Sequence, residues 1–238
     1  MRRASILSFF VIVACMLVGA IGSAGANATE NKSEWAVNKG GGKLEALKAG
    51  EAEALSETIT TTKNWAIKQT TGSTIAVECT KASFVGESKI VGLREIKFVP
   101  LLFTGCKVTA PAADKECEVQ SSGFPNGEIR TQALGFSAVE GLEGPTSNPH
   151  LRMLPESSRE EIVTIQLKKA GEKACANVVS LEVAGVPIAK IDSSKAAKAH
   201  KWEFGKNTGT RLTFGGEEAT FTGSGEFTLK SGKEWGDV

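Results

Sequence analysis

Tyrosine is absent from the chain, and histidine is limited to two residues among 238. Tyrosine is the residue most used where an exposed ring must both stack and form hydrogen bonds, so its absence counts against a sugar-binding or protein-binding face. His150 and His200 lie far apart in the sequence, and neither stands in a His-Glu-x-x-His metal-binding pattern. Each histidine is predicted to be a surface or half-buried side chain.

The chain also lacks an excess of charge of either sign. It has 28 Lys and Arg residues against 27 Asp and Glu residues, a net charge of +1. A near-neutral chain creates no long-range field that would gather phosphates or an anionic membrane, so we expect no nucleic-acid partner. The composition, 41% hydrophobic and 23% charged, is typical of a globular protein and excludes disorder, collagen and coiled coil.

Acidic residues are missing from positions 1–26. Arg2 and Arg3 precede an apolar stretch from Ile6 to Ile21, which a run of small residues follows. This three-part layout predicts a secretory signal helix that is removed after Ala26, with Ala28 as the alternative cleavage site. We therefore expect a secreted protein.

Two alternatives would keep the chain at the cell envelope. The apolar segment counted from Ala4 has nearly the ~20 residues that a membrane-spanning helix needs, so it is also compatible with an uncleaved anchor. The residues before Cys15 resemble a bacterial lipobox, although the apolar run continues for six more residues after that cysteine. Membrane contact is expected only if the signal segment is retained or Cys15 is acylated.

Four cysteines remain beyond the signal segment, an even number that predicts two disulfides in an exported chain. Three connectivities are possible. Cys106 and Cys117 flank two short strand-like pieces around the turn at 111–114, and a hairpin there would bring the two sulfurs together. We therefore predict the pairs Cys106–Cys117 and Cys79–Cys175. Structural zinc sites usually use close cysteine pairs, which this chain lacks, so no metal and no cofactor is expected.

Apolar and polar residues alternate with a period of two beyond Thr58, as strands with one buried face require. Turn residues separate about a dozen such strands, and no helical segments stand between them as a parallel sheet would need. The pattern predicts an all-β fold, an antiparallel β-sandwich, with a β-barrel as the alternative. Among the residues that share faces are Ile75, Val77 and Cys79; Leu101 and Phe103; Val163, Ile165 and Leu167; Trp202 and Phe204; and Phe227 and Leu229.

Three segments are expected along the chain: the signal at 1–26, a flexible lead-in at 27–57 and a single β-rich domain at 58–238. The lead-in is rich in Lys, Glu, Ala and Gly, and it holds a weak helical candidate from Lys43 to Leu55 that Gly50 interrupts; a short hairpin is also compatible with this segment. The charged stretch from Gly141 to Glu161 is the only plausible seam for a division into two domains. The predicted Cys79–Cys175 bridge would cross that seam, which favours one domain.

Several short motifs carry a family resemblance. They are Trp35-x-Val37-Asn38, Ile75-x-Val77-x-Cys79, Leu102-Phe103-Thr104-Gly105-Cys106-x-Val108, Cys117-x-Val119 and the ending Phe221-x-Gly223 to Ser231-Gly232-x-x-Trp235-Gly236. With them the chain resembles the abundant secreted proteins of unknown function from soil actinobacteria of the Solirubrobacter kind. The resemblance implies export and a β-rich fold, and it brings no catalytic residue with it.

Catalytic patterns are few. No Gly-x-Ser-x-Gly elbow occurs, so the sequence identifies no serine nucleophile. A glycosidase needs only two carboxylates about 5 to 10 Å apart, for which several acids are eligible. They are Glu118, Glu128, Glu160, Glu161, Glu182 and Glu203. An acid that alternates with apolar residues usually marks the solvent face of a strand, so no catalytic residue is predicted.

The four tryptophans divide into two pairs. Trp65 and Trp202 alternate with apolar residues and are predicted to lie in the core. Trp35 and Trp235 lie near the ends of the mature chain, outside clear strand patterns, and are the candidates for ligand contact. Alternatively, they pin the termini onto the sheets.

Together these features predict an exported β-protein that serves as a non-enzymatic binding or structural module of the cell envelope or extracellular space. Its partner would be an extracellular or envelope ligand that the sequence does not identify. A secreted glycan-active hydrolase is the first alternative, and a lipid-anchored surface protein is the second.

Overall fold

The computed structural model describes residues 34–56, 58–92, 95–97, 99–139, 150–155, 160–171, 173, 175–205 and 212–238. The predicted signal helix, its cleavage sites and Cys15 lie outside the described residues, as does most of the proposed seam at 141–161. Within the described ranges, no helix is long and apolar enough to span a membrane.

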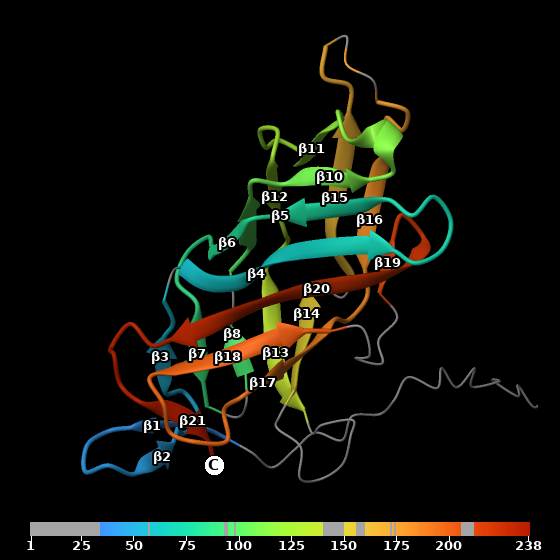
Figure 1. The fold of residues 1–238 in the computed structure, drawn as a ribbon. Helices are drawn as coiled ribbons and strands as arrows, with labels where there is room; N and C mark the ends of the chain where they lie inside the picture. The colour runs from blue at the N-terminus through green and yellow to red at the C-terminus, as the bar shows by residue number, and fades with distance from the viewer. Residues whose placement is uncertain are drawn as a thin grey trace, which may run out of the picture.

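The predicted all-β antiparallel fold is confirmed. The sheet curls into a half-barrel, which is intermediate between the expected sandwich and the alternative barrel (Figure 1). Strands pair along its main course in the order β10 (Lys107–Ala110), β5 (Ala76–Cys79), β4 (Thr58–Gln69), β20 (Glu217–Thr228), β18 (Ala199–Phe204), β17 (Ile188–Ile191), β14 (His150–Pro155), β13 (Leu134–Val139), β8 (Glu95–Lys97), β7 (Lys89–Val91) and β3 (Ala52–Ala54).

Two branches leave this course from its longest strands, β4 and β20, which run side by side across the middle of Figure 1. The first branch pairs the start of β4 with β6 (Lys81–Phe84), then β9 (Leu101–Thr104) and β12 (Glu128–Arg130). The second pairs the start of β20 with β19 (Thr213–Phe214), then β16 (Ser180–Ala184), β15 (Glu161–Lys168) and β11 (Glu118–Ser121). Register shifts near Ser224 interrupt the β4–β20 ladder, and such bulges bend a strand so that it can serve two sheets.

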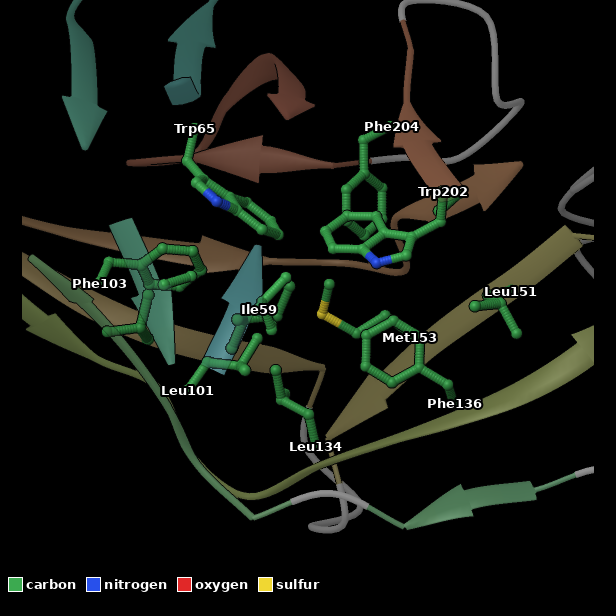
Figure 2. Close-up of a cluster of buried hydrophobic side chains, with 14 of the residues drawn as sticks. Ile59, Trp65, Leu101, Phe103, Leu134, Phe136, Leu151, Met153, Trp202 and Phe204 are labelled. Carbon is green, nitrogen blue, oxygen red and sulfur yellow. The ribbon is translucent and has the colours of Figure 1, made fainter. Parts of the chain in front are cut away.

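An aromatic cluster fills the inside of the curled sheet (Figure 2). Trp65 is 2% exposed, and its ring centroid lies 5.0 Å from those of both Phe103 and Trp202. Phe221 lies 5.5 Å from the same ring. The prediction that Trp65 and Trp202 belong to the core is therefore confirmed. These rings come from β4, β9, β18 and β20, so a single cluster ties the main course to its first branch.

Two glycines on β20 make room for the indole rings. A Cβ atom at Gly223 would lie 2.9 Å from Trp65 Cε3, and one at Gly225 would lie 2.6 Å from Ile59 Cγ2 and from Trp202 Cζ2. Both distances are shorter than carbon atoms tolerate without displacement. Glycine is required at these positions because the rings pack directly against the backbone of β20.

Residues 35–55 form paired strands and not a flexible lead-in; the helical candidate from Lys43 to Leu55 is wrong, whereas the short hairpin considered for this segment forms around Gly40, Gly41 and Gly42. β1 (Trp35–Asn38) pairs with β2 (Leu44–Ala46) and with β21 (Trp235–Asp237), while β3 joins the main course. Leu47 and Leu55 are buried, at 3% and 1% exposure. Gly50, with φ of 87°, occupies the turn between β2 and β3, a conformation that a helix does not contain. The polar composition of this segment gave no sign that it pairs with the C-terminal strand β21.

All four cysteines beyond the signal segment form disulfides, but the predicted pairing is wrong. The bonds join Cys79 to Cys106 and Cys117 to Cys175. Strand β10 does not form a hairpin with β11, because it pairs with β5 in a register that places Lys107 opposite Glu78. Continuing that register puts Cys106 opposite Cys79, with their Cα atoms 3.9 Å apart. Meanwhile β11 pairs with β15, whose following loop carries Cys175.

Peptide mapping without reduction should recover Cys79 linked to Cys106 and Cys117 linked to Cys175. Sequence separations of 27 and 58 residues correspond to about 3.5 and about 4 kcal/mol of chain-entropy stabilisation. The double substitution of Cys117 and Cys175 by serine is therefore expected to lower the free energy of unfolding somewhat more than the same change at Cys79 and Cys106. A peptide that links Cys106 to Cys117 would contradict the β5–β10 register.

Substitution Gly225→Ala should destabilise the fold by about 1–3 kcal/mol, because the added methyl group overpacks the contact between Ile59 and Trp202. The matched control is Gly135→Ala in β13, where the nearest atom to the new Cβ would be Leu154 O at 3.9 Å. That variant should stay within about 0.5 kcal/mol of the parent in urea denaturation. If both variants lost the same free energy of unfolding, the conformational freedom of glycine would explain the destabilisation, and the lack of space beside Gly225 would not.

Candidate functional site

A groove opens where the two branches of the sheet meet. The backbone N–H of Arg130, at the end of β12, donates to Ser121 Oγ of β11 at 2.9 Å. Two residues farther on, the N–H of Gln132 donates to the carbonyl oxygen of Ile162 in β15 at 3.0 Å. The groove beside these contacts has a volume of about 480 Å³. Its lining residues are Pro100, Ser121, Ser122, Phe124, Arg130, Thr131, Gln132, Glu161, Val163 and Thr164.

The groove carries one cation and one anion among its described lining residues. The guanidinium carbon of Arg130 lies 5.6 Å from the centroid of the Phe124 ring, a cation–π geometry. The Glu161 carboxylate accepts a hydrogen bond from the hydroxyl of Thr164 at 2.8 Å. Arg130, Phe124 and Glu161 are all half-buried. The site therefore offers a flat aromatic and guanidinium surface, a carboxylate and several hydroxyl or amide groups, with a net charge near zero.

A β-bulge at the start of β15 shapes this groove. The register between β15 and β16 shifts between Glu161 and Val163, and the adjacent side chains Ile162 and Val163 are both buried. Strict alternation would bury only one of two neighbours. As a result Glu161 and Thr164, three positions apart, both line the groove.

An apolar cavity lies beneath the groove. Its volume is about 50 Å³, and its walls include Trp65, Phe103 and Met153. Thr131 and Val163 line both spaces, so they form the wall between groove and cavity. The Thr131 hydroxyl accepts from the N–H of Leu101 at 2.9 Å and donates to the carbonyl oxygen of Gln132 at 2.7 Å, so its polar atom is occupied by the backbone.

Trp35 and Trp235 do not form the ligand-contact surface that the sequence suggested. They are 1% and 0% exposed, and their ring centroids lie 5.6 Å apart in an edge-on arrangement. Antiparallel pairing of β1 with β21 brings the two indoles together from opposite ends of the described chain (Figure 1). The alternative, that the rings pin the terminal strands, is the one that the structure supports.

The two histidines are also more buried than expected, at 3% for His150 and 2% for His200. Both ring nitrogens of His200 lie within hydrogen-bonding distance of backbone carbonyl oxygens, Nδ1 with that of Asp192 and Nε2 with that of Trp235, the latter at 2.7 Å. The His200 ring also meets the Trp235 ring at 4.4 Å. This histidine fastens the C-terminal strand to the main course, and it does not line the groove.

Asp114 forms a second polar cluster, at the end of the short 3₁₀ helix η1 (Ala112–Asp114). Its carboxylate lies close to the sulfurs of Cys117 and Cys175, all within 4.8 Å. The sulfurs are joined in the disulfide, and the carboxylate accepts from the backbone N–H and the side-chain Nδ2 of Asn177 at 2.9 and 2.5 Å. The cluster therefore holds the loop after β15 in place.

Lys39, Glu51 and Glu87, which form exposed ion pairs, have shifted pKa values. A hydrogen bond from the Lys39 ammonium, with a second from the backbone N–H of Lys48, lowers the pKa of Glu51. Lys89 likewise lowers the pKa of Glu87 by donating a hydrogen bond to it. Both shifts favour the charged carboxylate, whereas a general acid at neutral pH needs a raised pKa.

Sequence reasoning missed most of the groove. Of the six carboxylates considered for glycoside hydrolysis, Glu161 is the one that lines it, while Glu203 pairs with Lys63 at 2.6 Å on the exposed face. Phe124, Arg130 and Gln132 follow no catalytic or binding motif. A usable signal was present in the adjacent apolar residues Ile162 and Val163, which break the alternation of β15 and indicate a bulge.

Comparison with known proteins returns no similarity on which a function could be based. No protein-family model, no curated protein sequence and no solved structure matches the chain. The function is therefore argued from the residues of the groove and the cavity.

Substitution His200→Phe should lower the free energy of unfolding by about 1–2 kcal/mol, because it removes the polar contacts of the ring with the carbonyl oxygens of Asp192 and Trp235, of which the second keeps the N–H of Ala197 as a donor. Hydrogen exchange should accelerate first at the backbone amides of Trp235 and Asp237, which pair with this region. The control Lys201→Ala changes an exposed neighbour on the same strand and should have little effect. Unchanged exchange in His200→Phe would show that the histidine does not fasten β21.

Proposed function

We propose that this chain is an exported, non-enzymatic binding module that takes a small ligand in the groove between β11, β12 and β15. The observation that carries the proposal is the groove itself, whose volume of about 480 Å³ falls within the range of about 300–1,000 Å³ typical of small-molecule sites. It combines an aromatic ring, a guanidinium group and a carboxylate at the junction of two sheet branches, a place where a rigid scaffold holds side chains from separate elements.

Export is supported by several independent features. The two disulfides are of the kind that persists in oxidising compartments. The three-part layout of residues 1–26 is that of a secretory signal, and the resemblance to secreted proteins of soil actinobacteria points the same way. We propose the extracellular space as the place of action, with attachment to the envelope as the alternative.

Binding is favoured over catalysis by what lines the groove. Glycoside hydrolysis needs two carboxylates flanking the bond, and Glu161 is the one carboxylate among the described lining residues. Neither histidine lines the groove, and the Ser121 hydroxyl already accepts from the backbone N–H of Arg130. A glycan-active hydrolase would need groups that this set does not bring together.

The test uses the chain without its predicted signal segment and two small polar probes, the uncharged methyl β-D-glucoside and the zwitterionic glycine betaine. Their binding is measured by saturation-transfer NMR. At least one probe should bind, and Arg130→Ala and Phe124→Ala should each weaken that binding by about tenfold or more. The control Lys63→Ala removes an exposed ion pair outside the groove and should leave binding unchanged.

Binding that survives both groove substitutions would overturn the assignment of the site, and so would the failure of both probes to bind. Release of glucose from cello-oligosaccharides, abolished by Glu161→Gln, would replace the binding role with the hydrolase alternative.

A further inference from the structure

The groove and the cavity are two spaces of opposite character that share a wall. The groove presents Arg130, Glu161 and hydroxyl groups, whereas the cavity is lined by buried aromatic and aliphatic side chains. Thr131 and Val163 line both. A polar site placed directly over a dry apolar one is the arrangement that an amphiphilic molecule would fill.

The cavity suits a short apolar group. Cavities lined by aliphatic and aromatic side chains stay empty of water and accept small apolar molecules, since water there would find no hydrogen-bond partner. A volume of about 50 Å³ is well below that of an ordinary small-molecule site. It therefore fits the few carbon atoms at the end of a tail and not a long acyl chain.

The groove suits a head without net charge. Arg130 and Glu161 contribute one positive and one negative charge to its lining. A head with a single charge would leave the opposing side chain facing a like charge, whereas an uncharged polyol or a zwitterion meets both.

Val163 is the residue that can open the wall. Thr131 is fixed by its two hydrogen bonds to the backbone of Leu101 and Gln132. Val163 has no polar side-chain atom, and it follows the β-bulge at which the pairing of β15 with β16 shifts. Movement of its side chain breaks no hydrogen bond.

We infer that the ligand is an amphiphile with an uncharged or zwitterionic polar head in the groove and a short apolar tail that enters the cavity past Val163. This inference rests on the proposed function, because it assigns the ligand class of the same groove. It adds the cavity as a second subsite and Val163 as the residue that determines tail specificity.

The mature chain provides a built-in reporter of cavity occupancy. Methionine occurs three times in the full sequence, at positions 1, 16 and 153, and only Met153 lies beyond the signal segment. Met153 lines the cavity. A chain beginning at Asn27 and labelled at the methionine methyl group therefore gives one cavity signal in NMR spectra, besides that of any added initiator methionine.

The experiment titrates this labelled chain with two matched pairs of probes, methyl and n-hexyl β-D-glucoside, and glycine betaine and N-hexyl-N,N-dimethylglycine. In at least one pair the hexyl compound should bind about tenfold tighter than its short partner, and it alone should shift the Met153 methyl signal. Val163→Ile should remove most of that tenfold gain of the hexyl compound over its short partner. The control Val37→Ala, at a buried valine of β1 that lines neither space, should leave the gain unchanged.

The outcomes separate the two proposals. Equal affinities of long and short probes, both weakened by Arg130→Ala, would overturn the amphiphile and retain the groove. A Met153 shift with affinities that Arg130→Ala and Phe124→Ala leave unchanged would overturn the groove as the head site, and with it the amphiphile. If no probe of either pair binds, both proposals fail.

Discussion

The packing of Trp65 against Gly223 of β20 is the contact on which the half-barrel depends. The indole sits at the centre of an aromatic cluster, and it reaches the backbone of β20 because Gly223 has no side chain. Strands β4 and β20 are therefore held close together near the positions where each strand changes its pairing partner, β4 from β6 to β5 and β20 from β19 to β18. Because the two strands are antiparallel, the branches begin at opposite ends of the β4–β20 ladder, at Thr58 and Glu217, on either side of this contact.

The same contact accounts for the cavity. Trp65 and Phe103 are large and rigid, and they come from the main course and from the first branch respectively. The second branch adds smaller side chains, such as Ile165 and Val183, to the lining. Large rigid rings and short aliphatic groups together leave space that neither can fill. The void lies where the branches meet, which places it under the groove.

The sequence was a good guide to strands and a poor guide to their partners. Alternation identified the buried faces and placed Trp65 and Trp202 in the core, because that signal depends on neighbouring positions alone. The disulfides were paired wrongly because the partner of β10 is β5, and nothing in residues 106–117 reveals that register. The polar segment at 35–55 looked flexible for a similar reason: its strands pair with β7 and with β21, which lie farther along the chain. The groove escaped notice because it is assembled from both branches, and only the bulge at Ile162 and Val163 left a trace in the sequence.

The two disulfides act on different parts of the sheet. Cys79–Cys106 ties β5 to β10 in the main course, and Cys117–Cys175 ties the start of β11 to the loop after β15, where Asp114 and Asn177 add hydrogen bonds. At the junction of the branches, the backbone N–H groups of Arg130 and Gln132 donate to Ser121 Oγ and to the carbonyl oxygen of Ile162. Because neither bond involves the Val163 side chain, the proposed entry of a tail past Val163 would leave in place the strands that position Arg130 and Glu161.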